Sequence, residues 1–187
     1  MSHQSLHGKP APPLTLTNYD GTEFKFEPGS KGIPTALFFY PEAGSYGCTK
    51  EACQFRDARA EKDTFGAGKV EIIGISPDSV EKQKAFVEKN KLTYPVLSDS
   101  NGDASKAYGV GKGLFGILKV ARVTFIIDAK GVVRDSVEGT LNFGAHSKFV
   151  AKWLETLEAE KKKPAAAEPV APGAEEPTPA AALAPST

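Results

Sequence analysis

The chain has 187 residues and no net formal charge at neutral pH, and 40% of its residues are hydrophobic, which fits one globular domain. The balanced charge argues against a protein that binds nucleic acid or an anionic membrane through a basic surface. No stretch approaches the roughly 20 apolar residues that span a bilayer, and the start of the chain lacks the apolar segment of a secretory signal. We therefore expect an intracellular protein, cytoplasmic or nuclear.

The first part of the chain predicts strands that alternate with a helix. Residues 14–26 place alternating apolar residues on both sides of Asp20-Gly21, a pattern typical of a β-hairpin. Residues 35–40 form a short apolar run between two prolines, as expected of a buried central strand. Residues 48–65 contain no Pro or Gly and mix apolar with charged residues, which predicts an amphipathic helix.

The second part of the chain continues this alternation. Strands are predicted at 70–76, 94–97, 123–128 and 132–137, and helical segments at 78–90, 104–108 and 145–159. Asp78, followed three residues later by Glu81, is the expected N-cap of the second helix. The last helix is expected to place Phe149, Trp153, Leu154 and Leu157 on one side.

This order of elements indicates an α/β fold, in which helices flank a mixed central sheet and a β-hairpin forms an N-terminal extension. We expect residues 1–8 to be flexible and residues 9–160 to form the domain. Residues 161–187 are dominated by Ala and Pro and lack aromatic residues. Such a segment cannot bury enough apolar surface to offset its ordering entropy, so we expect a disordered tail.

The two cysteines of the chain lie close together in the sequence. Cys48 falls in the first turn of a predicted helix, where free backbone N–H groups and the helix dipole favour a thiolate. Cys53 lies five residues further along, so in an intact helix the two Cα atoms are roughly 8 to 9 Å apart. A disulfide requires about 7 Å or less. The two cysteines can therefore bond only when the first turns unwind, which favours a transient catalytic disulfide over a structural one.

Other interpretations of the cysteine pair remain open. Both residues can be small buried apolar side chains, because free cysteine is among the most buried residue types. A thioredoxin-type pair is less favoured, because the spacing is C-x4-C rather than C-x-x-C. A zinc site is also less favoured, since His3 and His7 lie in the segment expected to be flexible and only His146 then remains beside the thiols.

The segment around Cys48 resembles the peroxiredoxins, and within them the bacterioferritin comigratory protein or peroxiredoxin Q group. Pro41, Ser45 and Cys48 match the pattern P-x-x-x-[TS]-x-x-C, and GCTKEAC places a second cysteine five positions after the first. Arg122 in ARVTFIID matches the family arginine that approaches the active-site sulfur. The resemblance covers roughly residues 8–158.

The resemblance implies a thioredoxin-like fold and a peroxidase that reduces hydrogen peroxide and organic hydroperoxides. It implies attack by Cys48 to give a sulfenic acid, a disulfide with the resolving Cys53, and recycling by thioredoxin, without a metal, haem or flavin cofactor. Separately, we expect a monomer. Arg122 would stabilise the thiolate and the departing oxygen, and Ser45 would bond the thiol or the peroxide. Pro41 would shape the substrate pocket, and Glu51 would orient Arg122.

Two positions depart from the family pattern. Ser45 stands where the family often has Thr, which keeps the hydroxyl group, and Tyr46 stands where it often has Pro, which leaves the loop less rigid. A second class of function stays open beside the enzyme: a thioredoxin-like binding or holdase module with little peroxidase activity.

Overall fold

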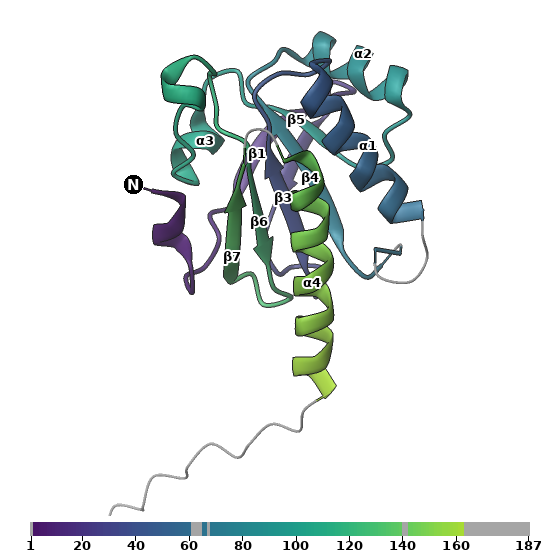
Figure 1. The fold of residues 1–187 in the computed structure, drawn as a ribbon, viewed down its shortest axis with the longest axis vertical. Helices are drawn as coiled ribbons and strands as arrows, with labels where there is room; N and C mark the ends of the chain where they lie inside the picture. Colours follow the sequence, from purple (N-terminus) through teal and green to yellow (C-terminus); the bar gives the residue numbers. More distant parts are fainter. Residues whose placement is uncertain (1, 61–64, 67, 140–141, 163–187) are drawn as a thin grey trace, which may run out of the picture.

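A computed structural model describes residues 2–60, 65–66, 68–139 and 142–162. In this part of the chain one seven-stranded sheet forms the centre of the molecule, in the order β2-β1-β5-β4-β3-β6-β7 (Figure 1). The strands are β1 (Leu14–Asn18), β2 (Glu23–Phe26), β3 (Thr35–Phe39), β4 (Glu71–Ser76), β5 (Val96–Ser98), β6 (Val123–Ile127) and β7 (Val133–Glu138). The helices are η1 (His3–Leu6), α1 (Tyr46–Ala60), α2 (Val80–Asn90), α3 (Asp103–Ala107), η2 (Leu114–Gly116) and α4 (Phe143–Lys162).

The sheet is mixed, as the alternation of strands and helices predicted. The central strand β3 runs parallel to β4 and antiparallel to β6, and Phe39 lies opposite Val123. β5 runs parallel to β4, and the hairpin of β1 and β2 adds to its free edge in the antiparallel sense. The C-terminal end of β3 and the N-terminal end of β6 therefore lie side by side at the same end of the strands.

Side chains on the two faces of the sheet form two apolar cores, because successive residues of a strand point to opposite faces. Phe38 lies in the core that contains residues of α1, α2 and α4, and its ring stacks on that of Phe55 at 4.8 Å between centroids. Phe39 lies in the other core, with Tyr108 and with Ala104 of α3. All five residues of β3 are buried, which fits its expected place at the centre.

Two helix predictions need correction. Ser79, not Asp78, is the N-cap of α2, because its hydroxyl accepts a hydrogen bond from the Lys82 backbone N–H. The Asp78 carboxylate instead accepts hydrogen bonds from the Ala43 backbone N–H at 2.6 Å and from Ser76 Oγ at 2.9 Å. These bonds tie the start of α2 to the loop that precedes Cys48.

The second correction concerns the buried face of α4. Its buried residues are His146, Val150, Leu154 and Leu157, whereas Phe149 and Trp153 are only partly buried. The indole N–H of Trp153 donates to Asp135 on β7 at 3.1 Å. The helix is therefore rotated relative to the expected apolar face, and His146 is directed into the core.

The N-terminal segment, for which flexibility was expected, contacts the edge of the sheet. Residues 3–6 form η1 beside β7 (Figure 1), and the Gly8 backbone N–H donates to the Val133 carbonyl at 2.8 Å. His7 Nε2 and Ser136 Oγ lie 2.8 Å apart. These contacts cover the edge strand of the sheet, whose backbone groups would otherwise lack partners. The expected tail lies outside the described residues from position 163 on.

Within the described ranges, no helix combines the length and the apolar character needed to cross a membrane.

Candidate active site

The site forms where β3 ends and β6 begins. The chain leaves β3 after Phe39 and enters α1 at Tyr46, so Cys48 lies in the first turn of this helix. Arg122 immediately precedes β6 and therefore lies beside the end of β3. Its Nη2 atom donates a hydrogen bond to Cys48 Sγ at 3.2 Å. The structure thus brings together the cysteine and the arginine, which lie 74 residues apart in the sequence.

Arg122 contacts three groups at once. Its Nη1 atom donates to the Glu51 carboxylate through Oε2, and its guanidinium lies 5.0 Å from the centroid of the Phe143 ring. Cys48 is 1% exposed, Arg122 3% and Glu51 0%, so water screens these interactions very little. Burial disfavours the charge of Arg122, but Glu51 and Cys48 outweigh this effect and raise the pKa of the guanidinium. The site therefore holds a permanent positive charge beside the sulfur.

Phe143, at the start of α4, also packs near the loop before Cys48. A Cβ atom at Gly47 would lie 2.3 Å from an edge carbon of the Phe143 ring. The absence of a side chain at Gly47 therefore lets the ring approach α1 and cover Arg122. Tyr46 contacts the same ring edge to face at 6.3 Å between centroids, although 78% of its surface is exposed.

His146 lies on the far side of Glu51 and is fully buried. Its Nε2 atom lies 3.1 Å from the Gly139 carbonyl oxygen, and its Nδ1 atom lies 2.8 Å from Thr124 Oγ1 and 3.4 Å from Glu51 Oε1. Burial raises the pKa of Glu51 to about 7, against the lowering effect of Arg122. Burial, helped by the charge of Arg122, lowers the pKa of His146 to about 4.

The role of His146 and its contact with Thr124 were missed by sequence reasoning, which considered His146 only as a zinc ligand and expected Glu51 to contact only Arg122. A signal was present, because His146 shares the helical period of Val150 and Leu154 and so belongs to the buried face of α4. A histidine on such a face requires polar partners inside the core. Those partners, Thr124 and Glu51, come from other elements and carry no common motif.

Ser45 and Pro41 shape the loop between β3 and α1. Ser45 Oγ donates to the Glu42 carbonyl at 3.1 Å, and the Ser45 carbonyl accepts from the Thr49 backbone N–H at 2.9 Å. The hydroxyl predicted to bond the thiol or the peroxide therefore closes the turn at the start of α1. Pro41 is buried directly after β3. On the surface of the loop, Lys82 Nζ of α2 forms an ion pair with Glu42 Oε1 at 2.9 Å.

Cys53 lies in the same continuous helix as Cys48, and both thiols are free. Cys53 is half-buried, and its Sγ atom lies 3.9 Å from Asn90 Oδ1 at the end of α2. The middle of α1 is attached to the rest of the molecule, because the Tyr94 hydroxyl donates to the Ala52 carbonyl at 2.8 Å and Arg56 donates to the Asn90 carbonyl at 2.6 Å. A bond between the cysteines would require the first turns of this helix to unwind.

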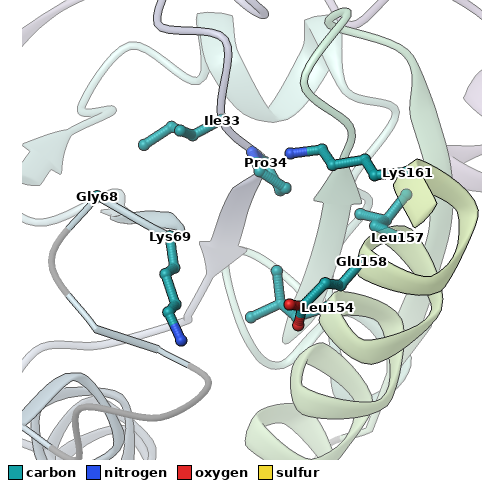
Figure 2. Close-up of a pocket in the computed structure, with 8 residues that line it drawn as sticks. All are labelled: Ile33, Pro34, Gly68, Lys69, Leu154, Leu157, Glu158 and Lys161. Atoms are coloured by element: carbon teal, nitrogen blue, oxygen red, sulfur yellow. The ribbon is translucent and has the colours of Figure 1, made fainter.

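A separate pocket of about 260 Å³ lies at the opposite end of the sheet (Figure 2). Pro34, which precedes β3, forms part of it, and Leu154, Leu157 and Glu158 line it from α4. Because Cys48 follows the other end of β3, this pocket is distinct from the site built around the thiol.

The chain matches known proteins over most of this domain. The AhpC/TSA family matches residues 7–136. The chloroplast peroxiredoxin Q of Sedum lineare is 37% identical over 150 residues, which cover 80% of this chain and 78% of that protein.

Solved structures show the same similarity. The peroxidoxin BcpB of Mycobacterium tuberculosis superposes with a TM-score of 0.70 and 34% identity, covering 81% of this chain and 97% of that one. The bacterioferritin comigratory protein of Xanthomonas campestris, which has been studied for alkyl peroxide reduction, gives a TM-score of 0.66 and 26% identity over 76% of this chain and 90% of that one.

These matches confirm the predicted thioredoxin-like fold. The chain belongs to the AhpC/TSA family and is a peroxiredoxin, a thiol peroxidase related to the peroxiredoxin Q and bacterioferritin comigratory proteins.

Proposed function

We propose that Cys48 is the peroxidatic cysteine of this thiol peroxidase and that it reduces hydrogen peroxide and organic hydroperoxides. The observation that carries this proposal is the buried hydrogen bond from Arg122 Nη2 to Cys48 Sγ at 3.2 Å. A permanent positive charge beside the sulfur favours the thiolate, which is the nucleophilic form of cysteine. Cys53 has the half-buried amide of Asn90 beside it in place of a guanidinium bond, which suits a different role.

In the first step, the Cys48 thiolate attacks one oxygen of the peroxide and the O–O bond breaks. The sulfur is oxidised to a sulfenic acid, and the leaving oxygen takes up a proton to become water or an alcohol. Negative charge grows on this oxygen as the bond breaks. Arg122 lies where its free hydrogen-bonding capacity can stabilise that charge, because a guanidinium has five N–H donors.

In the second step, the Cys53 thiolate attacks the sulfenic sulfur of Cys48, the S–O bond breaks as the disulfide forms, and the leaving hydroxide takes up a proton to become water. Because the cysteines lie five residues apart in an intact helix, this step requires local unwinding of α1. A thioredoxin-type dithiol then supplies the two electrons that restore both thiols.

The other residues of the loop support these steps. We assign Glu51 to the orientation of Arg122, to which it is bonded. Pro41 shields the site at the end of β3. Ser45 holds the turn before α1 through Glu42, and its hydroxyl serves the thiol or the peroxide when that turn rearranges. The protein is proposed to act as a monomer inside the cell, in the cytoplasm or nucleus, where thiols are kept reduced.

A coupled assay tests the function. Peroxide-dependent oxidation of NADPH is followed in the presence of thioredoxin and its reductase, with hydrogen peroxide and with an alkyl hydroperoxide. The wild-type chain is expected to sustain turnover, and Cys48→Ser is expected to abolish it with both peroxides, because serine is not a competent nucleophile at its ordinary pKa.

The coupled assay and an aggregation assay together separate the enzyme from a thioredoxin-like holdase. A holdase would suppress the aggregation of a denatured protein equally well with Cys48→Ser and would not consume NADPH. Turnover retained by Cys48→Ser would show that the assignment of Cys48 is wrong.

A further inference from the structure

The buried cluster contains one permanent cation and two groups that can become anions. Nη2 of Arg122 bonds Cys48, and Nη1 of the same guanidinium bonds Glu51. If both partners were ionised, the cluster would carry an uncompensated negative charge away from water, which is costly. Ionisation of Cys48 and ionisation of Glu51 therefore compete for the charge of Arg122.

The two oxygens of the Glu51 carboxyl group differ in their surroundings. Oε2 accepts the bond from Arg122, whereas Oε1 is buried and has no hydrogen-bond partner among the described residues. The Nδ1 atom of His146 nevertheless lies 3.4 Å from Oε1. A buried carboxylate oxygen without a partner is unfavourable, but a protonated Oε1 would be a donor that faces a ring nitrogen.

The tautomer of His146 follows from its other contact. The Gly139 carbonyl can only accept a hydrogen bond, so Nε2, at 3.1 Å from it, carries the proton. In the neutral ring, Nδ1 is then an acceptor. The Thr124 hydroxyl, at 2.8 Å, can donate to Nδ1 or rotate away and accept. Nδ1 can therefore accept a hydrogen bond from a protonated Glu51 carboxyl group.

We propose that His146 is a positioning residue for the peroxidatic thiolate: its Nδ1 atom accepts a hydrogen bond from the protonated Glu51 carboxyl group, which keeps Glu51 neutral and leaves the charge of Arg122 to Cys48. The inference rests on the proposed function, in which the Cys48 thiolate attacks the peroxide. When Cys48 loses its proton, the pair of Glu51 and His146 binds one, so the charge of the cluster is unchanged and no electrons are transferred.

The charged groups that face His146 fit this assignment. Glu51 approaches from α1 and Arg122 from the segment before β6, while β6 contributes the neutral hydroxyl of Thr124. Burial raises the pKa of Glu51 to about 7, and burial with Arg122 keeps the pKa of His146 near 4. When the pair holds one proton, that proton accordingly resides on Glu51 rather than on His146, and Nδ1 of His146 is the acceptor that faces it.

Two amide variants separate this role from a structural one. His146→Gln can keep a donor near the position of Nε2, and with it the bond to Gly139, but loses the acceptor at Nδ1. His146→Asn places an amide near the position of Nδ1 and loses the bond to Gly139. The ionisation of Cys48 is measured by thiolate absorbance at 240 nm against pH, with Cys53→Ser in every chain so that one thiol remains.

We expect His146→Gln to move the midpoint of this titration upward by about one pH unit, which lowers the thiolate fraction about tenfold at pH values below it. The rate of reaction with hydrogen peroxide should fall in the same proportion and recover at higher pH. His146→Asn should recover most of the wild-type midpoint. The matched control His7→Gln, at a histidine near β7, should leave it unchanged.

The role of Glu51 is tested by a double-mutant cycle. With Glu51→Gln, which has no carboxyl proton to share, His146→Gln should produce no further shift. Glu51→Gln alone should leave the midpoint at or below that of the wild type, since the competing anion is removed while the amide oxygen can still accept the bond that orients Arg122. The Glu51→Gln single variant remains informative if His146→Gln does not fold.

The inference is overturned if Gln and Asn at position 146 have equal effects, if the shift persists with Glu51→Gln, or if Glu51→Gln raises the midpoint. These results would leave the assignment of Cys48 intact. Peroxide turnover by Cys48→Ser would instead refute the proposed function itself.

Discussion

At the scale of single residues, the site depends on a side chain with several donors in a fixed plane. Arg122 bonds Cys48 through one nitrogen and Glu51 through another, while its face lies against Phe143. A lysine ammonium group is a compact charge on a flexible stem, so it cannot reproduce both bonds and the stacking contact. Positive charge alone therefore does not replace Arg122.

Arg122→Lys is expected to lower kcat/KM for hydrogen peroxide about 100-fold, as is typical for the loss of a preorganised donor to a developing negative charge. Stopped-flow measurement of the first oxidation of Cys48 checks this result. The control Arg134→Lys changes an arginine of β7 that pairs with Glu160 on α4 and should leave the rate unchanged. A wild-type rate for Arg122→Lys would contradict the role given to the guanidinium.

At the scale of elements, α1 combines two opposing requirements. Its intact first turn places Cys48 against Arg122, whereas the proposed disulfide would require the same turns to unwind so that Cys48 reaches Cys53. The Tyr94 hydroxyl, buried beneath the helix, donates to the Ala52 carbonyl between the two cysteines. This bond stabilises the intact helix and must break if unwinding extends to Ala52.

Tyr94→Phe should therefore shift the balance towards the unwound helix. A hydrogen bond of this kind contributes about 1 kcal/mol, so we expect the disulfide between Cys48 and Cys53 to form about fivefold faster after one equivalent of peroxide. Acid quenching followed by mass spectrometry measures the rate.

Tyr19→Phe removes a hydroxyl from a tyrosine outside α1 and serves as the control. An unchanged rate for Tyr94→Phe would show that the bond to Ala52 does not limit unwinding. A disulfide that fails to form at all in the wild type would refute the assignment of Cys53.

At the scale of the whole molecule, the buried pair of Glu51 and His146 affects how stability depends on pH. Folding raises the pKa of Glu51 from 4.5 to about 7 and lowers that of His146 from 6.5 to about 4. Between about pH 4.5 and 6.5 the folded protein thus holds a proton on Glu51, whereas the unfolded chain holds one on His146. The folded and unfolded states bind the same number of protons at these two residues. The pair therefore contributes little to the change of the free energy of unfolding with pH in this range.

Glu51→Gln removes the proton that the folded protein holds on Glu51, but leaves the one that the unfolded chain holds on His146. Below pH 6.5 the unfolded chain still protonates His146 while the folded state does not, so the free energy of unfolding should rise from about pH 4 to 6.5, by up to about 1 kcal/mol per pH unit. Urea unfolding at several pH values measures the slope. Glu155→Gln, an exposed position on α4, is the control, and a wild-type slope for Glu51→Gln would contradict the shifted pKa values.

Local signals in the sequence were enough to predict the order of strands and helices, the hairpin at Asp20-Gly21 and the place of Cys48 in the first turn of a helix. These features depend on turn residues, apolar periodicity and helix termini, which act over a few neighbouring positions. The resemblance then added Arg122 and Glu51. Boundaries were less accurate, because the hydroxyl of Ser79 rather than the carboxylate of Asp78 caps α2.

Tertiary structure decided which distant residues share the site. The antiparallel pairing of β3 with β6 places Arg122 beside Cys48, and the packing of α4 directs His146 towards Glu51. The contacts of the N-terminal segment with β7 likewise depend on which strand lies at the edge of the sheet. Such contacts arise from packing and hydrogen bonding between segments far apart in the chain. The sequence by itself therefore determined the cysteine that is proposed to react and the helix that holds it, while the fold determined which charged groups and which histidine surround it.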